Sequence, residues 1–181
     1  VQVSLESGPP ELQTNRLRER GFDALVVDLR SVTPADDLLI EDLGQMRGGF
    51  ICRVGHPLAK LNTPITFAHL QRYPLASTSL NPELARLLIT RYGPAADPQV
   101  AVTLRCNDVN SLLHAVHGSD AVFLGLVSPA REAIANGSLV ELPITPALNE
   151  GAHFAFVTLA DRTEAPAMGI FRQFVAEHLH D

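Results

Sequence analysis

GGFICRVGHPLAK, residues 48–60, contains a strand-like run that ends abruptly. Residues 50–54 favour β-structure, and Gly55, His56 and Pro57 follow them directly. A proline has no amide hydrogen to give to a β-ladder and fixes its own φ, so it ends strand pairing and redirects the chain. The stretch therefore predicts a strand that leaves its sheet at residues 55–57. We interpret His56 as a structural residue at this exit and not as a catalytic one.

Strand-like and helix-like segments alternate along the rest of the chain. Apolar or alternating runs predict strands at residues 1–7, 22–28, 73–79, 100–106, 121–126, 139–144 and 153–161. Helical periodicity predicts helices at residues 11–20, 82–92, 109–117, 130–135 and 166–180. Asn81 with Pro82, and Asn107, are predicted to cap two of these helices. Alternating strands and helices predict an α/β fold with largely parallel sheets.

Composition excludes several classes of protein. The 181 residues are 46% hydrophobic and 19% charged, which predicts a folded, soluble chain. No apolar run reaches the ~20 residues that span a membrane, and no secretory signal pattern is present. A net charge of -6 argues against direct binding of this chain to the phosphate backbone of a nucleic acid. Cys52 and Cys106 are expected to be reduced thiols with no redox function, because nothing in the sequence brings them together.

Motifs for catalysis or metal binding are missing from the sequence. The seven histidines form no HExxH pattern, and no nucleophile elbow or phosphate-binding glycine loop follows a strand. No metal, no cofactor and no enzymatic activity are therefore expected. Ser77, Thr78 and Ser79 follow a predicted strand, where open α/β sheets bind ligands, so they form either a hydroxyl-lined ligand site or a capped turn.

These motifs together resemble the effector-binding domain of LysR-type transcriptional regulators. The resemblance rests on "GHPLA" (55–59), "RLRERGFDALVV" (16–27), "ITFAHLQRYPLAS" (65–77), "NDVNSLLHAVHGSDAVFLGL" (107–126) and "IANGSLVELPI" (134–144). Each motif is short, but their order and spacing cover nearly the whole chain. The family's helix-turn-helix and the first strand and helix of its effector domain have no counterpart here, so the chain is expected to be N-terminally truncated.

The resemblance implies a type II periplasmic-binding-protein-like fold with two α/β lobes and a central cleft. Residues 1–61 and 159–181 would form the first lobe, and residues 62–158 the second. The crossovers would lie near residues 60–66 and 153–160. Because the first lobe lacks a strand and a helix, we expect self-association in which residues 1–7 or 22–28 are covered by a neighbouring copy.

The resemblance also implies a function. The chain would be the cytoplasmic ligand-sensing domain of a bacterial transcription factor, in which a small molecule in the cleft modulates DNA binding by the absent N-terminal domain. A homodimer or homotetramer is expected, with no membrane partner. The alternative is a periplasmic solute-binding protein of a transporter, which shares the fold and would need a signal peptide upstream.

In the resembled family, the cleft is lined at positions that correspond here to Arg53, to Ser77, Thr78 and Ser79, and to Asn107. Helix N-termini favour anions, and an arginine binds a carboxylate in a bidentate manner. The prediction is a small anionic effector, such as an organic acid, held by these five residues. The other interpretation is that Ser79 and Asn107 only cap their helices while Arg53 pairs with a surface acid.

Overall fold

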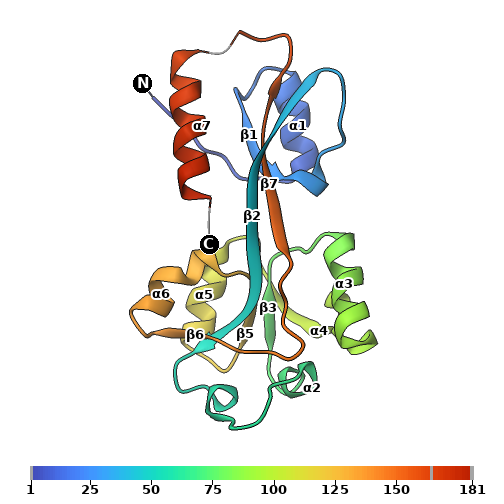
Figure 1. Ribbon diagram of the computed structural model, residues 1–181, viewed down its shortest axis with the longest axis vertical. Helices are drawn as coiled ribbons and strands as arrows, with labels where there is room; N and C mark the ends of the chain where they lie inside the picture. Colours follow the sequence, from blue (N-terminus) through green and yellow to red (C-terminus); the bar gives the residue numbers. More distant parts are fainter. Residues whose placement is uncertain (1, 164, 180–181) are drawn as a thin grey trace. The chain divides into compact units, whose positions relative to one another are not determined.

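The structure is a computed structural model that describes residues 2–163 and 165–179 (Figure 1). Its strands are β1 (Leu25–Asp28), β2 (Leu38–Arg53), β3 (Leu75–Ser77), β4 (Val102–Arg105), β5 (Val122–Leu126), β6 (Leu139–Glu141) and β7 (Gly151–Leu159). Its α-helices are α1 (Pro10–Arg18), α2 (Phe67–Leu70), α3 (Pro82–Tyr92), α4 (Pro98–Ala101), α5 (Val109–His117), α6 (Arg131–Ala135) and α7 (Pro166–His178). Short 3-10 turns lie at Leu29–Ser31, Pro57–Lys60, Pro94–Ala96 and Ser128–Ala130.

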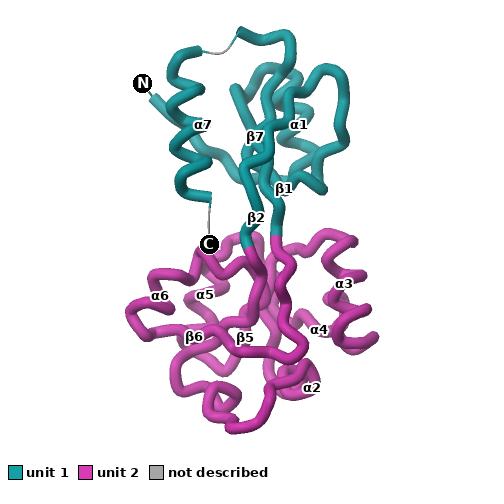
Figure 2. The backbone as a smooth tube through the Cα atoms, in the orientation of Figure 1, with its two compact units in different colours: residues 1–46, 152–180 teal, residues 47–151, 181 magenta. Residues whose placement is uncertain are grey.

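The described chain forms two compact units (Figure 2). Unit 1 contains residues 2–46 and 152–179, and unit 2 contains residues 47–151. The chain passes from unit 1 to unit 2 within the long strand β2 and returns at the start of β7. The sequence prediction put these boundaries at 61/62 and 158/159. In the structure both come earlier, at 46/47 and 151/152. The first does so because β2 continues without a break through residues 38–53, so its last part pairs within unit 2.

Unit 1 is built on the antiparallel pair β1 and β7, in which Val26 lies opposite Phe156. Neighbouring side chains on a strand point to opposite faces. Leu17 of α1 accordingly packs with Leu25 and Val27 on one face, and Phe171 of α7 packs against Phe156 on the other, with ring centroids 6.0 Å apart. In Figure 1, α1 and α7 lie on either side of these strands.

Unit 2 contains a mixed sheet. Strand β5 pairs antiparallel with β2, with Phe50 opposite Leu124, and parallel with β3, with Ser77 opposite Leu124. Strand β4 continues the sheet parallel to β3, and β6 pairs antiparallel with the end of β2. The predicted parallel arrangement therefore holds for β3, β4 and β5, whereas β2, β6 and β7 make antiparallel pairs.

Two local predictions differ from the structure at the front of the chain. Residues 2–8 alternate like a strand, but they form no strand in the structure. The strand predicted at residues 50–54 begins twelve residues earlier, at Leu38, because polar residues such as Glu41 and Asp42 are tolerated on an exposed part of β2. The predicted cap Asn81 is confirmed, because its side chain accepts a bond from the Leu84 amide at 2.8 Å.

Candidate functional site

The carboxyl ends of β3 and β4 meet at one edge of the unit 2 sheet. Ser77, the last residue of β3, lies opposite Arg105, the last residue of β4. Thr78 and Ser79 follow β3, and Asn107 follows β4 by two residues. Parallel strands end at the same edge of a sheet, which is where ligands bind in open α/β folds. This edge is the candidate site, and it lies within unit 2.

Ser77 is closed off from this edge. Its side chain is completely buried, and its hydroxyl donates a hydrogen bond of 2.7 Å to the carbonyl oxygen of Leu124 on β5. The hydroxyl therefore joins two strands of the sheet, and no ligand in solvent can reach it. The prediction that Ser77 contacts the effector is not supported by this geometry, whereas the partly exposed Thr78 and the exposed Ser79 remain accessible.

Ser79 and Asn107 come together, as the sequence predicts. The Ser79 hydroxyl lies 3.3 Å from Oδ1 of Asn107 and donates to it. Asn107, however, is not the cap of α5. Asp108 is the cap, and its Oδ1 accepts from the Asn110 amide at 3.1 Å. The cap therefore lies one residue later than predicted. The Asp108 carboxylate also accepts a bond of 2.6 Å from the Ser111 hydroxyl.

The position of Asp108 changes the electrostatics of the predicted site. The Ser111 hydroxyl, together with the amides of Asn110 and Ser111, holds the pKa of the Asp108 carboxyl below its usual value. A carboxylate thus already occupies the positive end of α5. A second anion at this helix start would be repelled by it. The start of α3, in contrast, is capped by the neutral side chain of Asn81, so its cap carries no charge.

Arg53 lies at the opposite edge of the sheet, so it does not join this group. Because β2 runs antiparallel to β5, Phe50 is level with Ser77, and Arg53 lies three residues further on, away from Ser79. At ~3.3 Å per residue, Arg53 and Ser79 are separated by about 15 Å along the strands. Arg53 instead pairs with Asp120, donating from Nε at 3.0 Å and from Nη2 at 2.6 Å. This is the arrangement of the alternative interpretation, in which Arg53 pairs with a surface acid.

Two other arginines face the candidate site. A cavity of about 370 Å³ is lined by Thr78, Ser79, Arg86 of α3 and Arg105 of β4. Arg105 donates to the carbonyl oxygen of Pro98 at 2.7 Å. Among residues 2–163 and 165–179, no carboxylate forms an ion pair with Arg86 or with Arg105. A cavity with hydroxyls and two such cations suits an anion.

The sequence analysis missed both arginines. Arg105 could have been found, because it ends a predicted strand two residues before Asn107. Arg86 could be placed only by the tertiary fold, since nothing in the sequence says that the exposed face of α3 turns towards the end of β4. The same cavity also contains Asp97, whose Oδ1 accepts from the Gln99 amide at 2.9 Å and caps α4.

His56 has a structural role in unit 2. Its side chain is fully buried, and its Nδ1 accepts from the Leu58 amide at 3.0 Å, which caps the turn Pro57–Lys60. The ring proton is therefore on Nε2, which donates to the carbonyl oxygen of Asp120 at 3.1 Å. The ring also meets Tyr73 edge-on at 4.5 Å. Both nitrogens are used, so the ring has no free atom for proton transfer.

Cys52 should resist modification in the folded chain. Its thiol is completely buried, and burial raises its pKa to about 12, so almost no thiolate forms at neutral pH. Cys106 is partly exposed, and its Sγ accepts from the Asp108 amide at 3.4 Å. We expect a thiol reagent to label Cys106 alone in the native chain and both residues after unfolding. Rapid labelling of Cys52 without unfolding would contradict this expectation.

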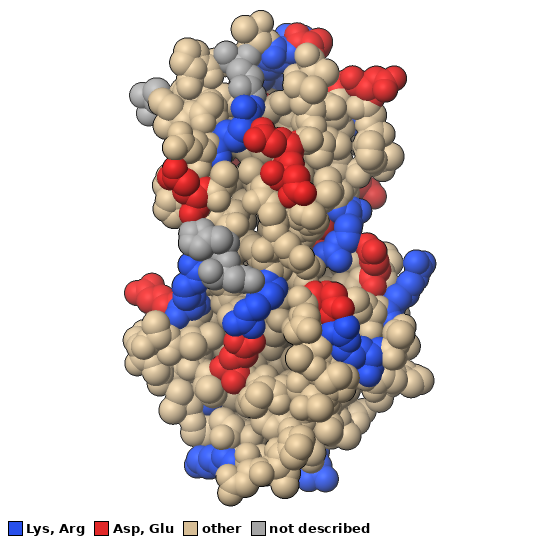
Figure 3. Space-filling view, viewed as in Figure 1, with Lys and Arg blue, Asp and Glu red and all other residues tan. Residues whose placement is uncertain are grey.

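The described residues contain neither a candidate metal site nor a candidate membrane-spanning helix. No group of three or more His, Cys, Asp or Glu side chains among them is arranged to hold a metal ion. None of their helices has the length and apolar character needed to cross a bilayer. On the face drawn in Figure 3, Lys and Arg side chains are interspersed with Asp and Glu and form no continuous basic patch.

Comparison with known proteins identifies the family. Residues 1–180 match the model of the "LysR substrate binding domain". The chain belongs to this family. Members of the LysR family are transcriptional regulators and not enzymes, and their effector-binding domains have the type II periplasmic-binding-like α/β fold. The LysR-type domain described here has the same fold and the ligand-sensing regulatory role of these domains.

Two curated proteins are similar to this LysR-type domain. One is the "SDS degradation transcriptional activation protein" of a Pseudomonas strain, 28% identical over 90% of this chain and 52% of its own length. The other is the tRNA-modifying bifunctional protein MnmC of Nitrosospira multiformis, 31% identical over 88% of this chain but only 29% of its own length. The chain thus spans about half of the first protein and less than a third of the second. Because the family model matches residues 1–180, the family of this chain is assigned from that match and not from the similarity to MnmC.

Solved structures agree on the fold. The effector-binding domain of QuiR, solved in complex with shikimate, has a TM-score of 0.66 with 16% identity. That match covers 94% of this chain and 78% of the QuiR domain. At this level of identity the likeness establishes the fold alone.

Proposed function

We propose that this LysR-type domain senses a small anion at the cavity lined by Thr78, Ser79, Arg86 and Arg105. The observation that carries the proposal is the pair of arginines that face one cavity without a carboxylate partner in the described chain. Two hydroxyl side chains beside them can donate further hydrogen bonds. Hydrogen bonds from arginine to a carboxylate or sulfate are charge-assisted and are roughly twice as strong as neutral ones.

The relatives support an anionic effector. QuiR binds shikimate, which carries a carboxylate, and the Pseudomonas activator is named for the degradation of dodecyl sulfate, which is also an anion. We extend this class of ligand to the present chain as an organic acid or organic sulfate. In the full-length regulator, DNA binding would belong to a separate domain, and the protein would act in the cytoplasm as a dimer or tetramer. The family match does not favour a transporter's solute-binding protein.

The proposal is tested by ligand screening followed by substitution. A thermal-shift screen with carboxylates and alkyl sulfates should find a ligand that raises Tm in proportion to the logarithm of its concentration over Kd. Arg86→Ala and Arg105→Ala should then each weaken binding by about 10- to 100-fold in calorimetry, since each removes a charge-assisted bond of roughly 1.5–3 kcal/mol. Arg72→Ala is the matched control, because Arg72 is exposed, lies outside the cavity and has no carboxylate partner in the described chain.

Arg53→Ala distinguishes the two placements of the site. If the anion binds at the cavity with Arg86 and Arg105, this change leaves affinity within about twofold, because Arg53 lies at the other edge of the sheet and is paired with Asp120. A loss of affinity in Arg53→Ala, with wild-type affinity in Arg86→Ala and Arg105→Ala, would refute the present placement and restore the one predicted from sequence.

A further inference from the structure

The cavity at the candidate site contains a negative charge as well as two positive ones. Arg86 belongs to α3, Arg105 ends β4, and Asp97 lies in the connection just before α4. Oδ1 of Asp97 accepts from the Gln99 amide at 2.9 Å, and no described residue donates to its second carboxylate oxygen. Asp97 therefore caps α4 with one oxygen and keeps the other for a further donor.

Asp97 lies close to Arg105 in the fold but does not pair with it. Nη2 of Arg105 donates to the carbonyl oxygen of Pro98, the residue directly after Asp97, at 2.7 Å. Within the part of the chain that the structure describes, Asp97 nevertheless forms no ion pair with Arg105 or with Arg86. The cavity thus holds opposite charges that do not neutralise each other.

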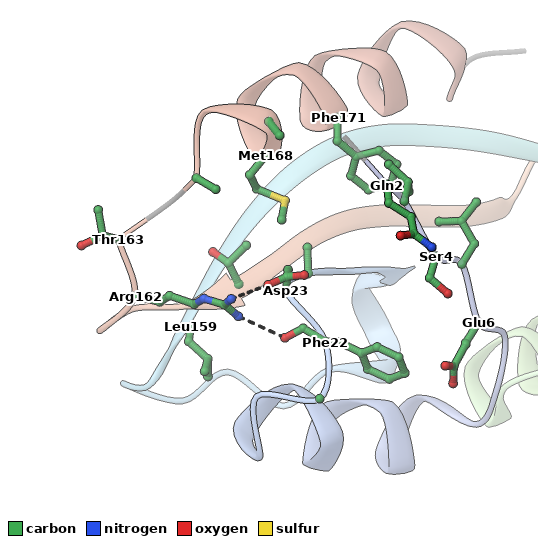
Figure 4. A pocket seen from close by; sticks show the side chains of 17 residues that line it. Gln2, Ser4, Glu6, Phe22, Asp23, Leu159, Arg162, Thr163, Met168 and Phe171 are labelled. Carbon is green, nitrogen blue, oxygen red and sulfur yellow. Dashed lines mark hydrogen bonds and ion pairs between the residues drawn. The ribbon is translucent and has the colours of Figure 1, made fainter.

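A cavity in unit 1, drawn in Figure 4, differs in this respect. Arg162 and Asp23 both line it, and they form an ion pair with each other. The Arg162 guanidinium also donates to the carbonyl oxygen of Phe22 at 3.3 Å. A charged ligand there would have to break an existing pair, whereas in unit 2 both kinds of charge are available to a ligand that carries both.

One face of α3 gives the unit 2 cavity an apolar wall. Pro82, Ala85, Arg86 and Ile89 line the cavity, and their spacing of three and four residues places them on one side of the helix. Ala85 and Ile89 are only partly buried, so they leave apolar surface that a ligand can cover. A ligand held by Arg86 would therefore lay its carbon skeleton against apolar side chains.

The volume of the cavity limits the size of its ligand. It measures about 370 Å³. Small-molecule sites typically measure ~300–1,000 Å³, so this cavity is near the lower end of that range. At ~30 Å³ per water molecule, it holds about a dozen waters. A single amino acid fits this space together with its side chain.

We infer that the ligand is an α-amino acid with an apolar side chain, an inference that rests on the anion site proposed above. Its carboxylate binds Arg86 and Arg105, and its ammonium group donates to the second oxygen of Asp97. Its side chain lies against Ala85 and Ile89. An α-amino acid carries both charges on one carbon atom, which suits a guanidinium that contacts the residue next to the acid. Each end of the ligand then makes charge-assisted hydrogen bonds.

Asp97 also selects against simple organic acids. A carboxylate without an ammonium group brings a second negative charge to the cavity and leaves the free oxygen of Asp97 without a donor. Like charges brought together at a binding site lower the affinity. A repulsive group beside an attractive one distinguishes ligands that share a carboxylate. The presence of Asp97 therefore narrows the class of organic acids to those that also carry a positive charge.

The first test compares ligands that differ by one charged group. L-Leucine, 4-methylpentanoate, which lacks the ammonium group, and L-leucinamide, which lacks the carboxylate, are titrated into the 181-residue chain by calorimetry. The corresponding sets for L-methionine and L-phenylalanine are treated alike. We expect at least one amino acid to bind about tenfold more tightly than either of its analogues, since each analogue loses charge-assisted bonds at one end. If no amino acid binds, or if each analogue binds as tightly as its parent, the inference is wrong.

The second test is the substitution Asp97→Asn. Asparagine keeps the side-chain oxygen that caps α4 and removes the charge. The variant should bind the amino acid about tenfold more weakly, while its affinity for the analogue without the ammonium group stays the same or rises. Glu132→Gln is the matched control, because Glu132 is exposed on α6, lies outside the cavity and has the same charge. An equal effect of Asp97→Asn on both ligands would contradict the inference.

Arg86→Ala and Arg105→Ala separate a failure of this inference from a failure of the proposed function. If both variants weaken the binding of carboxylates while Asp97→Asn leaves the preference for the amino acid unchanged, the anion site stands and the ammonium contact is wrong. If neither arginine variant weakens the binding of any ligand, the anion site itself is wrong, and the inference fails with it.

Discussion

Replacing His56 by alanine is expected to lower the free energy of unfolding of unit 2 by about 3–4 kcal/mol. The change removes the cap from the Leu58 amide, which costs about 1 kcal/mol. It also leaves the Asp120 carbonyl without its donor, at a cost of about 1–3 kcal/mol, and removes the packing against Tyr73. In a chain of this length, the loss corresponds to a fall in Tm of about 6–16 °C, measurable by calorimetry.

Two other variants check the cause. His56→Asn keeps a side-chain acceptor for the Leu58 amide but is too short to reach Asp120, so it should lose about half as much stability. His117→Ala, at an exposed histidine of α5, should change stability by no more than about 0.5 kcal/mol. A His56→Ala chain as stable as the wild type would mean that the buried ring does not hold this turn in place.

Gly48→Ala should destabilise the chain by about 2–4 kcal/mol. A Cβ atom at this buried position would lie 2.6 Å from the carbonyl oxygen of Glu150, which also accepts from the Gly48 amide at 3.2 Å. The clash is with backbone, so no side-chain rotation relieves it, and β2 must shift away from residue 150 with loss of that hydrogen bond. Overpacking of this kind costs about 1–3 kcal/mol, and the lost bond adds about 1 kcal/mol. Denaturant unfolding would measure the difference.

Gly169→Ala is the matched control for this substitution. Gly169 lies within α7, and a Cβ built on it meets nothing within 4 Å. Alanine is favoured over glycine in a helix by about 1 kcal/mol, so this variant should be slightly more stable than the wild type. Equal stability of Gly48→Ala and the wild type would show that β2 adjusts without cost at Gly48.

Local sequence was sufficient to predict most elements of secondary structure. Strands β3, β4, β5 and β7 and helices α3, α5 and α7 lie within a few residues of their predictions, because apolar periodicity and caps such as Asn81 act over short distances. The prediction was wrong where strand pairing determines whether a strand forms. Residues 2–7 have the alternation of a strand, but a strand forms only when another strand lies beside it, and none does in the described chain.

Part of the geometry at the candidate site was predicted. Ser79 and Asn107 lie in contact as expected, since strand ends followed by polar residues meet at one edge of a parallel sheet. Arg53 was grouped with them wrongly, because sequence order does not reveal that β2 runs antiparallel to β5 and carries Arg53 to the far edge. Ser77 was named as a ligand residue, although period-two alternation leaves open which face of β3 is buried.

The sequence by itself therefore determined the fold class, the family motifs, the strand ends and the structural nature of His56, since each depends on residues close together in the chain. Only the tertiary structure decided strand direction and register, and hence which charges meet. It paired Arg53 with Asp120, gave the start of α5 to Asp108, and brought Arg86 of α3 and Arg105 of β4 to one cavity. These contacts join residues that are distant in sequence, and their geometry depends on how whole strands and helices pack.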